Sequence, residues 1–165
     1  MKVFGIAGFK NSGKTTLVVD LIVELKSRGL RVATIKHAHH EFDIDHPGKD
    51  SYLHREAGAD EVVVVSARRW AHIAELREAE EPSLSALLAK VGDVDLVLVE
   101  GYKHGAHPKL ELRRSGLDHP QLADEDPAIL AIVVDDDELN GSLPVLLRSD
   151  IDAIADFVLA NAAEN

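Results

Sequence analysis

Residues 8–15 read GFKNSGKT and match the pattern G-x-x-x-x-G-K-[ST] at every required position. This stretch follows a short apolar run at residues 3–7. It opens a segment, residues 14–28, whose leucines and valines recur at helical spacing. Glycines let a backbone wrap closely around phosphate groups, and the start of a helix adds the positive end of its dipole. The sequence therefore predicts a phosphate-binding loop between a buried strand and a helix.

The residue types in this loop suit a nucleoside phosphate bound with Mg²⁺. Gly8 and Gly13 permit the close approach of backbone amides. Lys14 supplies a positive charge to the β- and γ-phosphates, and the hydroxyl of Thr15 is a natural Mg²⁺ ligand. Thr16 is expected to donate to the α-phosphate.

Apolar runs and helical patterns alternate along the rest of the chain, which predicts an α/β fold with a mainly parallel sheet. A strand is expected at 32–35, buried strands at 61–66, 95–101 and 129–137, and a short strand at 143–148. Residues 109–114 alternate and predict a strand with one wet face, whereas residues 67–76 indicate a short strand or an exposed edge. Helices are expected at 49–58, 83–91 and 150–162, with Asp150 capping the last, and residues 160–165 are expected to fray. The whole chain, residues 1–165, is predicted to be one P-loop NTPase domain with helices on both sheet faces.

The composition narrows the range of partners. The chain has 165 residues and no cysteine, and its 18 basic and 29 acidic residues give a net charge of −11. Such a charge argues against nucleic acid and against anionic membrane surfaces, both of which require clustered Lys and Arg. No apolar run approaches the roughly 20 residues that span a bilayer. We therefore expect a soluble, cytoplasmic protein.

Acidic residues fall where strands end, at the edge of a parallel sheet that binds ligands. Glu100 ends the run at 96–99 and is predicted to hold Mg²⁺ directly or through water. Asp43 and Asp45 follow the second strand, and either could orient a water or hold the metal through water. The alternative for this stretch is an ordinary solvated acidic loop.

Histidines are concentrated near the same edge. Five of the nine lie within residues 37–54, namely His37, His39, His40, His46 and His54. Their spacing lacks the ligand pattern of a zinc site, so hydrogen bonding to phosphates, a partner or water is the favoured interpretation.

Four segments together resemble the molybdopterin-guanine dinucleotide biosynthesis protein B (MobB) family. They are GFKNSGKTTL, IKHAHHEFDIDHPGKDSYLHREAGA, SARRW and DLVLVEGYKHGAHPKLEL, and the resemblance covers about residues 2–150. It implies a homodimer that binds GTP and Mg²⁺ and hydrolyses GTP weakly at most. It also implies an adapter for the molybdenum cofactor guanylyltransferase, the enzyme that attaches GMP to molybdopterin.

The resemblance also implies roles for particular residues. It places nucleotide binding on Asn11, Ser12, Gly13, Lys14, Thr15 and Thr16, and the sensing of Mg²⁺ or γ-phosphate on Asp45 and Glu100. Asp45 and Lys14 are then the catalytic candidates for slow hydrolysis. Candidates for an anionic pterin or a partner surface are Lys36, His37, Lys49, Asp50 and Arg55, with Gly101, Tyr102 and Lys103 extending that site. Whether molybdopterin touches this chain is left open.

Guanine preference is implied by the resemblance, because the sequence has no N-K-x-D or T-K-x-D box. The acids at 135–137 are the nearest candidates for reading the base, with Asp135 first. Two other functions remain open at this point. A small-molecule kinase would use a lid arginine, for which Arg68-Arg69 and Arg113-Arg114 are candidates. A metallochaperone NTPase would use the histidine cluster.

Overall fold

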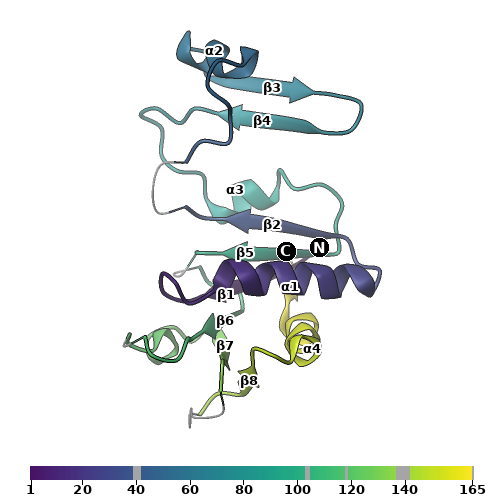
Figure 1. The fold of residues 1–165 in the computed structure, drawn as a ribbon, viewed down its shortest axis with the longest axis vertical. Helices are drawn as coiled ribbons and strands as arrows, with labels where there is room; N and C mark the ends of the chain where they lie inside the picture. The colour runs from purple at the N-terminus through teal and green to yellow at the C-terminus, as the bar shows by residue number, and fades with distance from the viewer. Residues whose placement is uncertain (39–41, 103–104, 118, 137–141, 165) are drawn as a thin grey trace. The chain divides into compact units, whose positions relative to one another are not determined.

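The computed structural model describes residues 1–38, 42–102, 105–117, 119–136 and 142–164. The chain divides into two compact units (Figure 1). The first combines residues 1–37 with residues 84–165 and contains the large sheet, and the second comprises residues 38–83. The expectation of one domain over residues 1–165 stays a prediction, and it did not anticipate that residues 38–83 cluster by themselves.

The first unit is built on a sheet in which six strands run parallel in the order β2-β5-β1-β6-β7-β8. A seventh strand, β9, pairs antiparallel with β1. The strands are β1 (Lys2–Ala7), β2 (Val32–Lys36), β5 (Leu96–Glu100), β6 (Lys109–Leu112), β7 (Ile129–Val134), β8 (Val145–Leu147) and β9 (Ala163–Glu164). All six parallel strands end at the same edge, which is where open sheets of this kind bind ligands.

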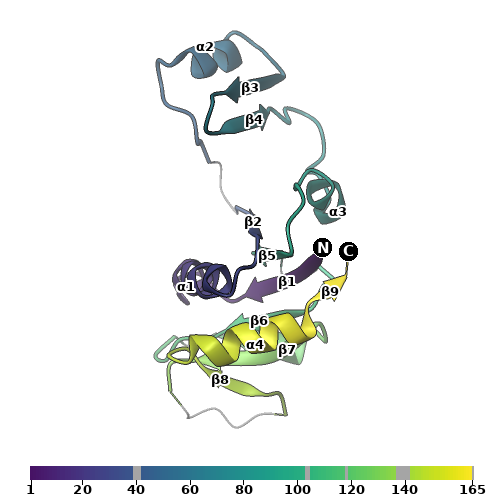
Figure 2. The same ribbon diagram turned by 90° about the vertical axis from the view of Figure 1, so that its right-hand side faces the viewer.

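Helices cover both faces of this sheet, as the sequence predicts. On one face α1 (Lys14–Ser27) and α4 (Ile151–Asn161) contact each other and bury a core that includes Phe4, Leu21 and Ile154. On the other face α3 (Leu84–Leu88) packs over β5 and β1 through a smaller cluster. Figure 2 shows α1 and α3 on opposite sides of β2 and β5. The α/β fold with a mainly parallel sheet is therefore confirmed.

The start of α4 is stabilised by its predicted cap. The Asp150 carboxylate accepts a hydrogen bond of 3.0 Å from the backbone N–H of Ala153. This bond satisfies one of the amides that every helix leaves without an intrahelical partner.

The prediction of a wet face on β6 was wrong. This strand lies between β1 and β7, and all four of its residues are buried, including Lys109 and Glu111. Lys109 Nζ donates to the Gly105 carbonyl at 2.5 Å and to the Asp126 carboxylate at 2.8 Å. Polar residues brought in by the surrounding loops therefore replace the water that the alternating pattern implies.

The expectation of a frayed C-terminus was also wrong in part. Ala163 and Glu164 form β9, which pairs with Val3 and Lys2 at the start of β1. The later residues of β1 pair with β6. β9 thus pairs with the first residues of β1, which β6 does not pair with.

The second unit contains α2 (Asp50–Glu56) and an antiparallel pair, β3 (Glu61–Val65) and β4 (Trp70–Ala74). The valine run at 61–66 was predicted to be a buried strand; the strand is confirmed, but the expectation that it is buried was wrong. Only Val62 is buried, whereas Val65 and Trp70 are 75% and 67% exposed. The apolar run thus predicts the strand correctly, but it does not determine whether other segments bury that strand.

Candidate functional site

The loop between β1 and α1 has the backbone that its sequence predicts. Gly8 and Gly13 have φ angles of 147° and 93°, in the region that L side chains avoid. A Cβ on Gly8 would lie 2.6 Å from the Leu112 carbonyl oxygen, so the loop packs tightly on the end of β6. Asn11, with φ of 66°, is a residue type that tolerates this conformation. Both glycines are thus required for the loop to wrap.

The first turn of α1 offers backbone donors towards the same loop. Gly13 caps the helix without a side-chain hydrogen bond, and the first turn holds no acid. The amides at a helix start need acceptors, and an anion is the natural one. Ser12 is 2% exposed and its hydroxyl has no hydrogen-bond partner among the described residues. The geometry is therefore that of a phosphate cradle.

The Lys14 side chain lies over the loop. Its Nζ donates to the Phe9 carbonyl at 2.7 Å. This bond folds the side chain back over the loop and holds the ammonium group beside the loop backbone. Positive charge, backbone donors and a helix start thus converge on one place.

Oxygen ligands for a cation lie beside the cradle, towards β5 and β2. The Thr15 hydroxyl donates to Oε1 of Glu100 at 3.4 Å, and Lys36 Nζ is 3.4 Å from both of these oxygens. Adjacent ligands of an octahedral Mg²⁺ ion are about 3 Å apart, given bonds of 2.0–2.1 Å. Thr15 and Glu100 therefore fit a Mg²⁺ ion that takes its other ligands from phosphate and water.

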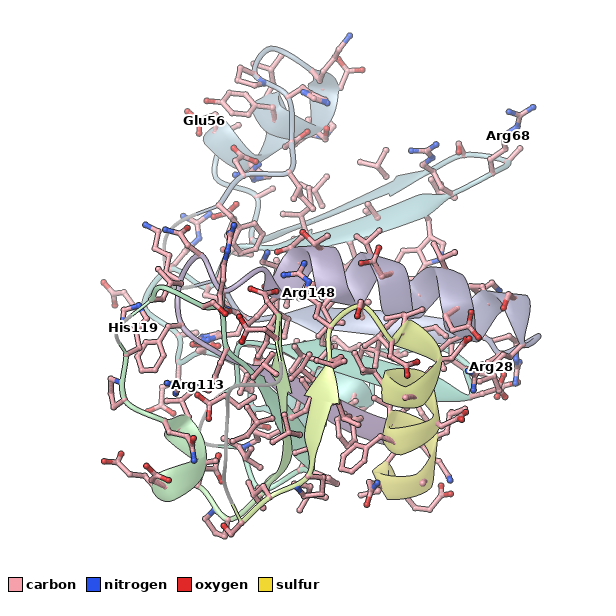
Figure 3. All side chains as sticks on the ribbon, turned by 60° about the horizontal axis from the view of Figure 1, so that its bottom comes forward. Arg28, Glu56, Arg68, Arg113, His119 and Arg148 are labelled. Atoms are coloured by element: carbon pink, nitrogen blue, oxygen red, sulfur yellow. The ribbon has the colours of Figure 1, made fainter. Side chains whose placement is uncertain are left out.

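An aspartate and an arginine lie on the opposite side of the cradle, where β7 and β8 end. Asp135 directly follows β7 and Arg148 directly follows β8. Nη1 of Arg148 is 3.9 Å from Oδ1 of Asp135. The adjacent Asp136 instead accepts 2.8 Å from the Ser115 hydroxyl. Figure 3 shows Arg148 beside the first turn of α1.

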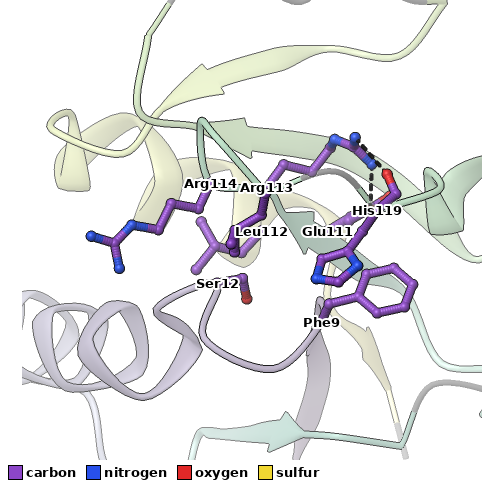
Figure 4. Close-up of a pocket in the computed structure, with 8 residues that line it drawn as sticks. Phe9, Ser12, Glu111, Leu112, Arg113, Arg114 and His119 are labelled. Atoms are coloured by element: carbon purple, nitrogen blue, oxygen red, sulfur yellow. Dashed lines mark hydrogen bonds and ion pairs between the residues drawn. The ribbon is translucent and has the colours of Figure 1, made fainter.

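A small cavity lies between these two sides, against the loop and β6 (Figure 4). The Phe9 and His119 rings stack there, with centroids 4.5 Å apart and planes 20° from parallel. Arg113 donates to the His119 carbonyl at 3.1 Å and to Glu111 at 3.3 Å. The cavity holds about 10 Å³, room for one water molecule at most. The end of β6 is therefore already filled by the chain itself.

Five further candidates belong to the second unit, namely Asp43, Asp45, Lys49, Asp50 and Arg55, and Arg55 binds the first two. Its guanidinium donates to Glu75 at 2.6 Å and to Asp43 at 3.0 Å, and lies 3.4 Å from Asp45. Asp45 also accepts from the Ser51 hydroxyl at 2.8 Å. The backbone N–H of Asp45, and after it the Arg55 guanidinium, hold the pKa of Asp43 below its usual range. These contacts stabilise the loop before α2.

Residues after β2 and β5 also meet. The His37 ring packs on Tyr102 with centroids 4.9 Å apart, and a Cβ on Gly101 would lie 2.9 Å from the His37 carbonyl oxygen. His39, His40, Lys103 and Asp137, named from the sequence, lie outside the described residues. Among the described residues, no group of three or more His, Cys, Asp or Glu side chains could hold a metal ion.

The structure thus brings together part of the predicted site. The first unit carries the loop residues, Glu100, Lys36 and Asp135 around one sheet edge, whereas Asp45, Lys49 and Arg55 belong to the second unit. The roles predicted for all of these residues stay predictions. Arg148 was missed by sequence reasoning. Its position at the end of a predicted parallel strand was the signal that could have found it.

A parallel sheet with this loop between its first strand and first helix defines the class of P-loop nucleotide-binding proteins. Residues 3–135 match the family described as MobB, molybdopterin guanine dinucleotide synthesis protein B. The chain belongs to this family, which confirms the resemblance drawn from its motifs.

Curated relatives support the same assignment over nearly the whole chain. A protein of Escherichia coli K12, named molybdopterin-guanine dinucleotide biosynthesis adapter protein, is 42% identical over 156 residues. That alignment covers 93% of this chain and 89% of the relative. A protein of Haemophilus influenzae with the same name is 40% identical over 158 residues, covering 93% and 85%.

Solved structures of the family share the fold. The crystal structure of a molybdopterin-guanine biosynthesis protein B has a TM-score of 0.73 at 29% identity, covering 96% of this chain and 97% of that one. The crystal structure of Bacillus subtilis MobB has a TM-score of 0.77 at 25% identity over the whole of both chains. Within the described residues, no helix is long and apolar enough to cross a membrane.

Proposed function

We propose that this protein binds GTP with Mg²⁺ at the P-loop and serves as an adapter in the synthesis of molybdopterin guanine dinucleotide. Its partner is the molybdenum cofactor guanylyltransferase, which attaches GMP to molybdopterin, and the setting is the cytoplasm. The observation that carries the proposal is the convergence of the loop, Lys14, Thr15 and Glu100 at one sheet edge. Membership of the family, whose relatives are named adapter proteins, supports the pathway.

The division of work between these residues follows from their contacts. Loop amides and Lys14 hold the β- and γ-phosphates, and Thr15 and Glu100 hold Mg²⁺, which neutralises phosphate charge when it is bound. Lys36 lies against both metal-binding oxygens, so it is placed to shift towards the γ-phosphate once a cation takes its place.

Slow hydrolysis is the expected consequence of how Asp45 is held. This residue was the candidate for orienting an attacking water, but its carboxylate is 8% exposed and is bound by Ser51 and Arg55. A carboxylate engaged in this way is a poor acceptor for a water proton. We therefore infer weak GTPase activity at most.

The described contacts favour an adapter over a kinase. Arg113, a candidate lid residue, is committed to Glu111 and to the His119 carbonyl. A guanidinium engaged in this way is not available to close over a transferring phosphoryl group, so the contacts of Arg113 favour the adapter.

We also propose a homodimer in which the β3–β4 hairpin meets a second copy. Val63, Val64, Val65 and Trp70 are between 45% and 75% exposed. A two-stranded sheet is marginally stable by itself, and an apolar surface of this kind is characteristic of interfaces. Sedimentation equilibrium measures the mass in solution, and a monomer at all concentrations would exclude the dimer. Lys36 and His37 of the first unit, and Lys49, Asp50 and Arg55 of the second, stay candidates for contacts with molybdopterin or a partner.

The experiment that tests the adapter role is a reconstituted reaction. Guanylyltransferase, molybdopterin and limiting GTP are incubated with this protein, with Lys14→Ala or with Lys26→Ala, and dinucleotide formation is measured. Lys26 lies in the last turn of α1, remote from the loop, and serves as the control. Wild type and Lys26→Ala should raise the yield and Lys14→Ala should not. Equal yields with and without the wild type would refute the role.

A further inference from the structure

Arg148 contacts the P-loop, and neither phosphate nor Mg²⁺ binding as proposed above requires that contact. The Cζ atom of Arg148 lies 3.1 Å from the position that a Cβ on Gly13 would take, so its guanidinium rests on the loop itself. The same guanidinium faces Asp135 at 3.9 Å, and the two side chains are 22% and 34% exposed. The Arg148 guanidinium, a donor of several hydrogen bonds, and the Asp135 carboxylate, an acceptor, therefore lie side by side next to the P-loop. Both side chains are accessible to a ligand.

The strand order decides which part of a nucleotide reaches them. Thr15, Glu100 and Lys36 mark the metal and γ-phosphate end, on the β5 and β2 side of β1. The nucleoside then extends to the other side, towards β6, β7 and β8. Two strand spacings, about 10 Å, separate β1 from β7. A ribose with its base spans that distance, whereas the cavity at the end of β6 is too small for a purine.

The chemistry of the pair matches one purine. The edge of guanine presents two donors, the exocyclic amine and N1–H, followed by two acceptors, O6 and N7. A carboxylate accepts from the first two, and a guanidinium donates to the last two. Adenine presents an acceptor at N1 where the carboxylate lies and a donor at N6 where the guanidinium lies. Both contacts would then be repulsive.

We propose that Asp135 and Arg148 read the guanine base, with Arg148 donating to O6 and N7 and Asp135 accepting from N1–H and the exocyclic amine. The inference rests on the proposed binding of GTP and adds the residues that select its base. Asp136 is left out because Ser115 already engages it. In this proposal the base is selected by Asp135 and an arginine thirteen residues further along the chain, with no N-K-x-D box.

The test compares dissociation constants for GTP, inosine triphosphate and ATP, each with Mg²⁺. Inosine keeps O6, N7 and N1–H but lacks the exocyclic amine. Arg148→Ala should weaken GTP and inosine triphosphate by the same factor, about 10- to 100-fold, and leave ATP unchanged. Asp135→Ala should abolish the difference between GTP and inosine triphosphate. Arg31→Ala is the matched control, because it removes an exposed arginine that pairs with Asp93 at 2.8 Å just before β2, at the opposite edge of the sheet, and it should change none of the three.

The outcomes separate this inference from the proposed function. Equal weakening of GTP and ATP by Arg148→Ala would make Arg148 a phosphate ligand and overturn the inference, as would unchanged binding of all three. Arg148→Lys keeps the charge but loses the two-pronged donor, so it should still lose guanine preference, and it substitutes for a poorly folding alanine variant. A wild type that binds GTP and ATP equally defeats only the inference. A wild type that binds neither defeats the proposed function as well.

Discussion

At the scale of single residues, burial changes the protonation of His107. Both ring nitrogens are buried and without a hydrogen-bond partner among the described residues, and the ring packs on Gly5. Desolvation, and after it the positive charge of Lys109, lowers the pKa of His107 to about 4. The folded protein therefore keeps this histidine neutral where an unfolded chain, with a pKa near 6.5, takes up a proton.

This difference predicts a loss of stability in acid. Between pH 6.5 and pH 4 the unfolded state binds the extra proton, so the contribution of His107 is complete above pH 6.5 and falls as the pH is lowered towards 4. In urea denaturation, His107→Asn should reduce the loss of unfolding free energy between pH 7 and pH 5 by about 1 kcal/mol, allowing for the partial exposure of the ring.

The matched control is His46→Asn, which removes an exposed histidine. It should leave the pH dependence as it is in the wild type. If His107→Asn loses as much stability between pH 7 and pH 5 as the wild type does, His107 is not the acid-sensitive group.

The sequence was sufficient to predict the residues of the P-loop, because they lie close together along the chain. The spacing of Gly8, Gly13, Lys14 and Thr15 encodes the loop because its geometry is formed within eight residues. Arg148 could not be found in the same way, since its contact with Gly13 joins positions 135 residues apart and exists only once the strand order is known.

At the scale of elements, β6 depends on a buried ion pair. Lys109 is 1% exposed, and Asp126, from the loop before β7, is its charged partner at 2.8 Å. Removing one partner leaves a buried charge uncompensated, which costs more than the intact pair gains. The other Asp126 oxygen accepts from the Ala128 N–H at 2.9 Å, a bond that asparagine can keep.

Asp126→Asn therefore removes the charge but keeps that bond, and it should lower the free energy of unfolding by about 3 kcal/mol. The double variant Lys109→Met with Asp126→Asn should recover most of that loss, because no charge is left buried. Urea denaturation measures both. Asp124→Asn, on the exposed part of the same loop, is the control, and an equal effect from it would show that the ion pair contributes nothing.

At the scale of elements, the limits of helices and strands were predicted well where the hydrophobic pattern is strong. The burial of a strand was predicted poorly where it depends on the segments that pack around it. The limits of β1, α1 and β5 follow the sequence within a residue or two. The alternation of polar and apolar residues in β6 predicted a solvent-exposed face. Lys109 and Glu111 are instead buried and form hydrogen bonds with the segment between β6 and β7, which the local pattern does not reveal. The valines of β3 predicted a core strand, although they form a hairpin outside the main sheet.

At the scale of the whole molecule, the net charge of −11 coexists with a site for a polyphosphate. Backbone amides, a helix start, Lys14 and Lys36 act over a few ångströms at one sheet edge, where overall charge matters little. The first unit contains this edge entirely. The proposed nucleotide site therefore belongs to the sheet unit.

The proposed function requires that this sheet edge binds GTP through the P-loop. Calorimetric titration of Mg²⁺–GTP into wild type, Lys14→Ala and Lys26→Ala measures that binding. We expect saturable binding by the wild type and by Lys26→Ala, and affinity at least tenfold weaker for Lys14→Ala with its thermal unfolding midpoint unchanged. GTP binding to Lys14→Ala with the affinity of the wild type would contradict the claim.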